Sequence, residues 1–451
     1  MAKKLSSVLG IDIGSHSIKV CEVKTSGNQA TISAVGVTPT PEGAVDYSGI
    51  YNSEAVGLAL KQVLAEAGAT SPSAVVTIAG QHSVLVRVLS VPNEPGQTKE
   101  QLDQQMDYEI NRNIPFAETN IQSDYQVLGN QDPNAPEKDV VMAMAPQSAI
   151  DAVIDCVKKA GRKPYAIDVE PLALARSMVT SYGEWGNEGV CMVDIGHSTT
   201  SINIYEGVNL VLPRPVPGGG ELLTRAIADA QGIGMTDAED YKQSRYSIPT
   251  DASAVSNAFD PFAVGGMTQS FDAGYNPGGY QASGMGEFNP SGDATMGNMS
   301  PQDDLAIDPI TGLPIESGED AAPAYSNDPF SAGDAGSGET TDSAPAVAEA
   351  TDPAFEATRG ILEDLIAELR RSIDYYTGKG GSVSRVVLCG GGAKLNGLAG
   401  YIERSMGIQT ELYDPLKNLN VAAKKASAEY INEYREQLAV AVGNGLHILV
   451  D

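Results

Sequence analysis

The chain has 451 residues, enough for two or more domains, and its formal net charge is −29. This acidic balance argues against a protein that binds nucleic acid or an anionic membrane surface through a basic face. No stretch is apolar enough to span a bilayer, and we recognise no signal peptide. No cysteine lies in a CxxC pair, and Cys21, Cys191 and Cys389 lie in or beside apolar runs. This pattern predicts buried, reduced thiols in a cytoplasmic protein.

The acidity is concentrated in one segment, from Tyr246 to Asp352. Its 107 residues include 17 acidic residues and no Lys or Arg, and they are rich in Gly, Ser, Pro, Asn and Ala. The segment has no sustained helical or strand period, so it cannot bury enough apolar surface to offset its chain entropy. We therefore predict that 246–352 is a long disordered insertion.

The rest of the chain alternates between strand-like and helix-like patterns. Before residue 188 we expect, in order, strands 8–13, 17–23 and 30–37, helix 53–67, strands 74–79 and 83–90, helix 98–111, strands 124–128 and 139–145, helix 147–160 and strand 165–169. After it we expect strands 190–195, 199–205 and 209–214, helices 220–230, 237–245 and 354–376, strand 385–388, and helices 398–405 and 435–449.

A short motif occurs twice, each time where a strand ends in a turn. Asp12-Ile-Gly14 and Asp194-Ile-Gly196 are both followed by small hydroxyl residues and then by further strands. This internal repeat predicts two related α/β domains, 1–188 and 189–451, that face each other. A cleft between duplicated domains is a common place for a ligand.

The residues of the first motif suit a magnesium-bound polyphosphate. The carboxylate of Asp12 organises the waters of a metal ion, while the backbone N–H groups of the turn hold anionic oxygens. Lys19 lies on the next strand and is able to reach the same point. The motif at Asp194 repeats this arrangement, so two opposed turns would hold the phosphates from both sides. Each turn carries a histidine, His16 in the first and His197 in the second, and we expect their backbone amides to matter more than their rings.

Two further segments lie at strand-to-helix junctions, and a third pair of residues lies on a helix face. The Gly390-Gly-Gly392 turn allows a close approach of backbone to a ligand, although a flexible turn would look the same. Glu239 and Lys242 share a helix face, which by itself is more typical of a solvated surface. Glu170 opens a helix, either as a water-positioning group in the cleft or as a carboxylate that stabilises the helix start. The chain lacks the GxxxxGK[ST] phosphate loop, a GxGxxG fingerprint after the first strand and zinc-ligand spacing.

The order of these motifs resembles the actin/Hsp70/sugar-kinase ATPase superfamily. More narrowly, the chain resembles the type IV pilus assembly family PilM, a relative of the division protein FtsA. The segments that carry this resemblance include Glu109-Ile-Asn-Arg-Asn-Ile-Pro-Phe116, Asp168-Val-Glu-Pro-Leu-Ala-Leu174, Ala238-Glu-Asp-Tyr-Lys242 and Arg371-Ser-Ile-Asp-Tyr-Tyr376. The membrane-binding C-terminal helix of FtsA is not recognised here, which favours the pilus family.

The resemblance implies a two-domain actin-like ATPase fold with a duplicated RNase H-like core. It also implies an extra small subdomain in the first domain, at about 92–163. Asp12 and Asp194 would hold Mg²⁺ through water, and Glu170 would orient the attacking water. The residues that would contact ATP are Asp12, Gly14, Ser15, His16, Ser17, Lys19, Gly196, His197, Ser198, Thr199, Gly219, Gly220, Glu239, Lys242, Gly390, Gly391 and Gly392.

The function implied by the resemblance is that of a cytoplasmic ATP-binding adaptor, with slow or no ATP hydrolysis. It would recruit the N-terminal cytoplasmic tail of a PilN-like inner-membrane protein in pilus or related secretion machinery, together with other assembly components. The protein would thus be peripheral to the inner membrane, without inserting into it and without binding nucleic acid. Self-association is left open. The alternatives are a small-molecule kinase on the same fold and an FtsA-like filament-forming division protein.

Overall fold

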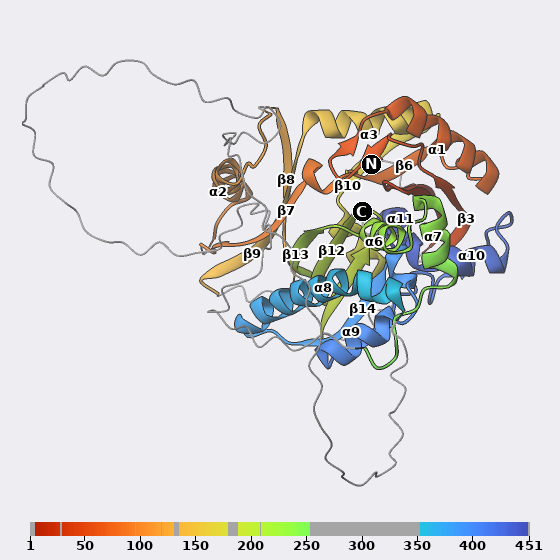
Figure 1. Ribbon diagram of the computed structural model, residues 1–451. Helices are drawn as coiled ribbons and strands as arrows, with labels where there is room; N and C mark the ends of the chain where they lie inside the picture. Colours follow the sequence, from red (N-terminus) through yellow and green to blue (C-terminus); the bar gives the residue numbers. More distant parts are fainter. Residues whose placement is uncertain are drawn as a thin grey trace, which may run out of the picture. The chain divides into compact units, whose positions relative to one another are not determined.

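The computed structural model describes residues 5–27, 29–94, 96–118, 120–129, 135–178, 188–207, 209–252 and 352–449. All of these belong to one compact unit (Figure 1). Most of the predicted insertion, 253–351, lies outside the described residues. Its predicted start is wrong, however, because Tyr246 and Ile248 are buried in a hydrophobic core.

The first sheet has six strands in the order β10-β6-β1-β2-β3-β16. Strands β1 (Ser7–Ile13), β2 (Ser17–Ser26) and β3 (Gln29–Pro39) are antiparallel, while β6 (Ser73–Thr77) and β10 (Lys163–Asp168) run parallel to β1 and to each other. Helices α1 (Ser53–Ala67) and α3 (Gln147–Lys159) cover one face of this sheet. Helix α1 begins where the Asn52 side chain caps it and ends at Gly68, whose φ of 71° suits a helix terminus.

The second sheet repeats this plan. Its order is β13-β12-β11-β14-β15, formed by β11 (Gly189–Ile195), β12 (Thr199–Glu206), β13 (Asn209–Pro217), β14 (Val383–Cys389) and β15 (Gln409–Leu412). Three antiparallel strands are again followed by two parallel ones. The predicted duplication of the core is therefore confirmed.

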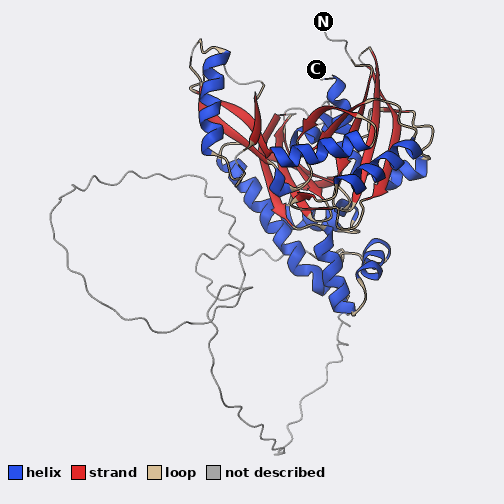
Figure 2. Ribbon diagram, turned by 90° about the horizontal axis from the view of Figure 1, so that it is seen from above, coloured by secondary structure: helices blue, strands red, loops and turns tan. Residues whose placement is uncertain are grey.

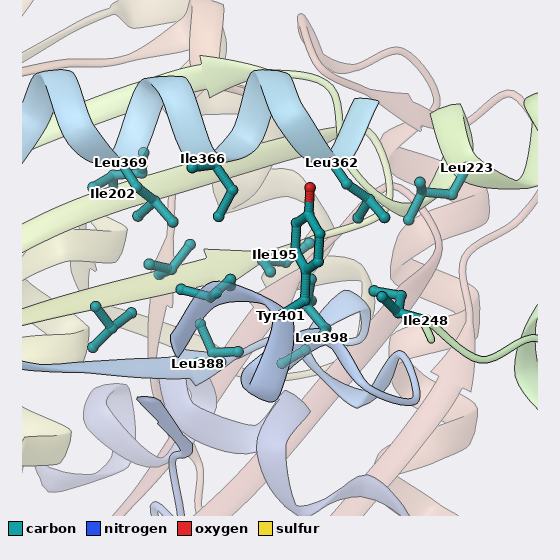
Figure 3. Close-up of a cluster of buried hydrophobic side chains, with 14 of the residues drawn as sticks. Ile195, Ile202, Leu223, Ile248, Leu362, Ile366, Leu369, Leu388, Leu398 and Tyr401 are labelled. Atoms are coloured by element: carbon teal, nitrogen blue, oxygen red, sulfur yellow. The ribbon is translucent and has the colours of Figure 1, made fainter. Parts of the chain in front are cut away.

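Four helices pack on one face of the second sheet: α6 (Gly220–Gln231), α7 (Met235–Ser244), α8 (Pro353–Gly378) and α9 (Leu398–Met406). In Figure 3, Leu362, Ile366 and Leu369 of α8 lie above Ile195 and Leu388 of the sheet and Leu398 and Tyr401 of α9, and Ile202 is drawn beside Leu369. Ile248 belongs to the same cluster, which explains why its segment is ordered.

Two short helices connect the halves of the molecule. Helix α4 (Glu170–Met178) packs on the second sheet, and α11 (Ala439–Gly445) packs on α4, β1 and β2. The contacts are close: a Cβ on Gly10 would lie 2.0 Å from the Ala441 carbonyl oxygen, and one on Gly443 would lie 1.8 Å from the Ala173 carbonyl oxygen. Only glycine fits at such crossings.

The end of the described chain therefore returns to the first sheet. Strand β16 (Asn420–Val421) pairs with β3, and α11 covers the face of β1 opposite α1. The structure thus differs from the prediction that 189–451 forms the second domain alone.

A third, three-stranded antiparallel sheet forms the small subdomain, in the order β7-β9-β8. It consists of β7 (Leu85–Pro92), β8 (Ile121–Val127) and β9 (Glu137–Pro146), with α2 (Lys99–Arg112) packed on it through Met106 and Ile110. Thr98 and Gln101 form a capping box at the start of α2. The predicted range 92–163 differs from this, since β7 begins at Leu85 and α3 packs on α1 instead.

Short elements complete the chain: β4 (Val45–Asp46), β5 (Gly49–Ile50), α10 (Ala428–Tyr434) and 3₁₀ turns at Gln81–Ser83, Gly392–Lys394, Arg435–Leu438 and Leu446–Leu449. Figure 2 shows helices, in blue, flanking the red strands. Within the described ranges no helix is long and apolar enough to cross a membrane. All four cysteines are buried and free, so the predicted burial of the thiols is confirmed.

Candidate functional site

A cavity of about 550 Å³, here called the central cavity, is lined by residues of both sheets. Every residue singled out in the sequence as a nucleotide or metal contact lines it, with the exception of Gly219. These lining residues are Asp12, Gly14, Ser15, His16, Ser17, Lys19, Glu170, Asp194, Gly196, His197, Ser198, Thr199, Gly220, Glu239, Lys242, Gly390, Gly391 and Gly392. Residues from distant parts of the chain are thus brought to one place.

The two turns after β1 and β11 have the same internal geometry. In the first turn, Gly14–Ser17, the Gly14 N–H donates to the Ser17 carbonyl oxygen at 3.1 Å. In the second turn, Gly196–Thr199, the Gly196 N–H donates to the Thr199 carbonyl oxygen at 2.9 Å. Each turn links two neighbouring strands of its sheet, β1 and β2 or β11 and β12, so the duplication of the core places the turns as a facing pair.

The first and second turns touch each other. The Ser15 and Ser198 hydroxyl oxygens are 2.8 Å apart, and the rings of His16 and His197 have centroids 4.9 Å apart. The two halves of the molecule thus meet directly where the two turns face each other.

Three carboxyl groups converge beneath the turns. Lys19 Nζ lies 3.2 Å from Asp12 Oδ2, which is the pairing that the strand register of β1 and β2 requires. Burial and the nearby Asp12 carboxylate raise the pKa of Asp194. Burial and the charge of Asp194 raise the pKa of Glu170 to about 8. The raised pKa values mean that the Asp194 and Glu170 carboxyls have too little positive charge around them to stabilise their ionised forms.

This deficit fits a divalent cation. Glu170 Oε1 is buried and has no hydrogen-bond partner in the described part of the chain. Carboxylate oxygens are ligands that Mg²⁺ prefers. Among the residues that the structure describes, no three His, Cys, Asp or Glu side chains are grouped to hold a metal directly. An ion here would therefore keep several of its waters, in the way that Mg²⁺ commonly does.

The triple-glycine turn fits closely against the end of β11. Gly390 has φ 83°, and a Cβ on it would lie 2.2 Å from Asp194 Oδ1. A Cβ on Gly392 would lie 2.3 Å from the Ile195 Cγ2. Gly391 has no such close neighbour, its nearest being Gln437 Cδ at 3.8 Å. Two of the three glycines are thus required by packing, while the turn still lines the central cavity.

Helices α6 and α7 are joined by a polar network. Lys242 Nζ lies 2.7 Å from Glu239 Oε2 and donates to the Gly220 carbonyl oxygen at 2.9 Å. Burial would raise the pKa of Glu239, but hydrogen bonds from Lys242, Thr224 and Gln243 outweigh it and hold the pKa at about 2. The Lys242 and Glu239 side chains are only 10% and 23% exposed, so this pair is not a solvated face.

Gly219 lies behind the second turn instead of facing the central cavity. A Cβ on it would lie 2.5 Å from the Gly196 carbonyl oxygen. The next residue, Gly220, donates its N–H to that same oxygen at 2.9 Å. Gly219 therefore supports the second turn through backbone packing.

Sequence reasoning missed three polar residues of β12 that lie alongside Glu170. Ser201 donates a hydrogen bond to the Glu170 carboxyl, and the Tyr205 hydroxyl donates to the Pro171 carbonyl oxygen at 2.7 Å. Asn203 lines the central cavity, and within the described residues its Nδ2 has no partner. The available signal was their spacing, because alternate residues of a strand share a face.

A second cavity, of about 420 Å³, lies where the small subdomain meets the separate two-stranded β4–β5 sheet and helix α3; we call it the side cavity. Its lining includes Tyr51, His82, Phe116, Glu118, Pro146 and Ser148. Tyr51 is 65% exposed, and the Ser148 hydroxyl donates to Glu118 Oε1 at 2.7 Å.

Comparison with known proteins identifies the family. A family model described as type IV pilus assembly protein PilM matches residues 10–269 and 354–448. A solved structure described as a PilM-PilN type IV pilus biogenesis complex has a TM-score of 0.69, 21% identity and coverage of 99% of each chain. At this identity the likeness shows the fold.

Curated relatives give a second line of similarity. Cell division protein FtsA of Neisseria meningitidis serogroup B is 27% identical over 122 residues, 27% of this chain and 29% of that protein. FtsA of Pseudomonas aeruginosa strain PAO1 is 26% identical over 255 residues, 52% and 60% of the two chains. The matches thus span less than two thirds of these relatives. With its two-domain actin-like fold and a family match over most of its length, the chain belongs to the type IV pilus assembly protein PilM family.

Proposed function

We propose that this protein binds Mg-ATP in the central cavity and acts as an adaptor that recruits the N-terminal tail of a PilN-like inner-membrane protein. The observation that carries the nucleotide assignment is the pair of equivalent turns that face each other above three carboxyl groups. Opposed turns with free backbone N–H groups hold a polyphosphate from two sides. When bound, Mg²⁺ would offset the charge of the carboxylates and of the phosphates.

The chain's own residues divide the work between binding and positioning. Asp12 and Asp194 hold the waters of the ion, and Lys19 neutralises part of the phosphate charge. Lys242 and Glu239, together with the Gly390–Gly392 turn, face the nucleoside. Glu170 positions a water through the hydrogen bond it accepts from Ser201. In the empty cavity the raised pKa of Glu170 leaves it largely protonated near neutral pH, and bound Mg²⁺ would favour its ionised form.

The side cavity is the proposed docking place for the tail. The related solved complex contains PilN, which makes a PilN-like protein the natural partner. Tyr51 and Phe116 offer apolar contact area, and Glu118 offers a charge for a basic residue of a short extended tail. Through this partner the protein would be cytoplasmic and peripheral to the inner membrane. It would thereby join other assembly components to the pilus machinery.

The nucleotide assignment is tested by calorimetry with and without Mg²⁺. Asp12→Ala should weaken Mg-ATP binding by roughly 1–3 kcal/mol, because a charged hydrogen-bonding group is lost. Asp374→Ala, an exposed acid on α8, is the matched control and should bind like wild type. Equal affinity in both variants would refute the assignment. Rapid ATP turnover that depends on a small sugar would instead favour a kinase.

The partner assignment is tested by titrating a fluorescent tail peptide. Tyr51→Ser should lower the affinity about tenfold, the usual scale for losing an aromatic contact at an interface. Tyr108→Ser on α2 is the matched control, since Tyr108 is 62% exposed and lies outside the side cavity. If Tyr51→Ser and Glu118→Gln both bind the peptide as tightly as Tyr108→Ser does, the tail docks elsewhere.

A further inference from the structure

Each of the two turns carries a histidine, and the two rings meet where the turns meet. The ring planes of His16 and His197, here called the histidine pair, are inclined by 37°. The backbone fixes both residues from outside: Thr40 N–H donates to the His16 carbonyl oxygen and Glu221 N–H to the His197 carbonyl oxygen, both at 2.9 Å. Both residues line the central cavity. The pair is thus held in place by the fold, and not by the contact between the rings.

The charged groups around the pair come from helices α6 and α7. Burial and the neighbouring His16 lower the pKa of His197. Glu221 on α6 acts in the opposite direction, with Oε2 3.6 Å from His197 Nε2, but Glu221 also pairs with Arg225 at 2.8 Å. Glu239 and Lys242 on α7 act on His197 with opposite signs. In the empty cavity His197 is therefore mostly neutral at neutral pH.

Two imidazolium ions cannot sit side by side at this distance without a compensating anion. Their repulsion in a partly buried site is strong, because water screens it poorly. A bound phosphate chain brings at least two negative charges to the turns that carry the rings. Phosphate binding and protonation of the pair must then favour each other.

We propose that the histidine pair is a specificity-determining phosphate contact, one that takes up a proton when a nucleoside di- or triphosphate binds between the turns. This proposal rests on the proposed nucleotide binding in the same cavity. It assigns a role to the rings themselves, where the sequence alone favoured the backbone amides of these residues.

The sign of the pH effect follows from linkage. Bound phosphate raises the proton affinity of the pair, so the contribution of the histidines to nucleotide affinity increases as the pH falls. This contribution begins near the pKa of His197 in the complex and levels off below the pKa of His197 in the empty protein, which burial and the neighbouring His16 lower. For each proton taken up, the affinity changes by up to about tenfold per pH unit within that window. Glu170 and Asp194 would release protons when Mg²⁺ binds, and this release acts in the opposite direction, weakening binding as the pH falls.

The test is calorimetric titration of Mg-ADP at pH 6.0, 7.0 and 8.0, with proton uptake measured in buffers of different ionisation enthalpy. Between pH 8.0 and pH 6.0, the ratio of the wild-type affinity to the affinity of His16→Asn/His197→Asn should rise by fivefold or more. His16→Asn/His197→Asn should still bind, but the number of protons taken up should fall by about 0.5 to 1. This variant keeps Glu170 and Asp194. The protons exchanged by these two carboxyls and by the ligand therefore cancel when the proton uptake of the variant is subtracted from that of wild type. His447→Asn, which lies outside the central cavity, should titrate like wild type.

Each outcome separates this proposal from the one on which it rests. Equal proton uptake by wild type and the double variant would overturn the role of the histidine pair, while leaving nucleotide binding intact. Absence of Mg-ADP binding by wild type at every pH would refute the proposed function itself. If the double variant does not fold, the single variants His16→Asn and His197→Asn decide the matter. Unchanged proton uptake in both would overturn the proposal.

Discussion

Asp194 and Gly390 are packed so closely that no side chain fits between them. A Cβ on Gly390 would lie 2.2 Å from Asp194 Oδ1 and 2.5 Å from the Ile195 carbonyl oxygen. The φ of Gly390, 83°, is also one that glycine adopts readily and other residues rarely do. The position of a carboxylate in the central cavity therefore depends on a residue that has no functional group.

Gly390→Ala should displace Asp194 as well as strain the backbone. We expect a loss of about 2–4 kcal/mol in the free energy of unfolding and a weaker affinity for Mg-ATP. Gly380→Ala is the matched control, because Gly380 also has a positive φ of 93° but no atom lies within 4 Å of its added Cβ. The control should lose only about 1 kcal/mol and bind normally. Equal effects of the two substitutions, measured by urea unfolding and calorimetry, would show that the steric contact is unimportant.

The Glu239–Lys242 pair should make stability depend on pH in acid. The folded-state pKa of Glu239, about 2, lies below its ordinary value of 4.5, so its stabilising contribution is complete above about pH 4.5 and is lost as the pH falls toward 2. Allowing for partial exposure, this contribution is roughly 1–2 kcal/mol. Glu239→Gln should be less stable than Asp240→Asn at pH 6, and the difference should narrow to about half at pH 3 and close near pH 2. A difference as large at pH 3 as at pH 6 in urea titrations would contradict the ion-pair origin.

Deletion of the insertion should affect stability differently depending on where the deletion begins, at residue 253 or at Tyr246. Replacing 253–351 by a Gly/Ser bridge should leave the melting temperature within a few degrees, because loop entropy changes slowly with length. Extending the deletion back to Tyr246 should lower it by more than about 5 °C, since two buried side chains are lost. Tyr246 contacts the Thr358 hydroxyl at 2.6 Å, and the Ile248 N–H donates to the Asn396 carbonyl oxygen at 2.9 Å. Equal melting temperatures for the two deletions would place the boundary at Tyr246 after all.

The thiols should be unreactive in the native protein. Cys21, Cys156, Cys191 and Cys389 are all buried, and burial raises the pKa of the Cys156 thiol to about 11 and that of Cys191 to about 12. Since the thiolate is the reactive form, a thiol-specific chromogenic reagent at pH 8 should label none of the four over an hour. In denaturing urea it should label all four. Stoichiometric labelling of native protein within minutes would mean that the structure opens readily.

The sequence predicted those site residues whose local pattern of neighbours is typical of a binding site. Asp12 and Asp194 each follow a buried apolar strand and precede a glycine, which predicts a carboxylate at a strand end without further information. Because the motif occurs twice, the facing arrangement of the two turns was also predictable.

The remainder depended on contacts between distant segments. In the sequence, Gly219 and Gly390 look like ligand-binding glycines. The atoms that pack against them belong to distant segments, so their packing role is seen only in the folded structure. Ser201 and Asn203 are ordinary strand residues until the register with β11 sets Ser201 opposite Asp194 and Asn203 opposite Met192. Likewise, no local pattern revealed that the segment from β16 onward returns to the first sheet.

Helix α11 has a consequence for how the protein is made. Its residues Ala441 and Val442 cover the face of β1 that carries Val8, more than 400 positions earlier in the chain. A nascent chain on the ribosome therefore exposes this apolar face until residues 439–445 have emerged. Contacts of such high sequence separation form slowly, and the exposed surface invites aggregation in the meantime. We therefore expect chains that stop before Ala439 to depend on chaperones during synthesis and to be degraded rapidly.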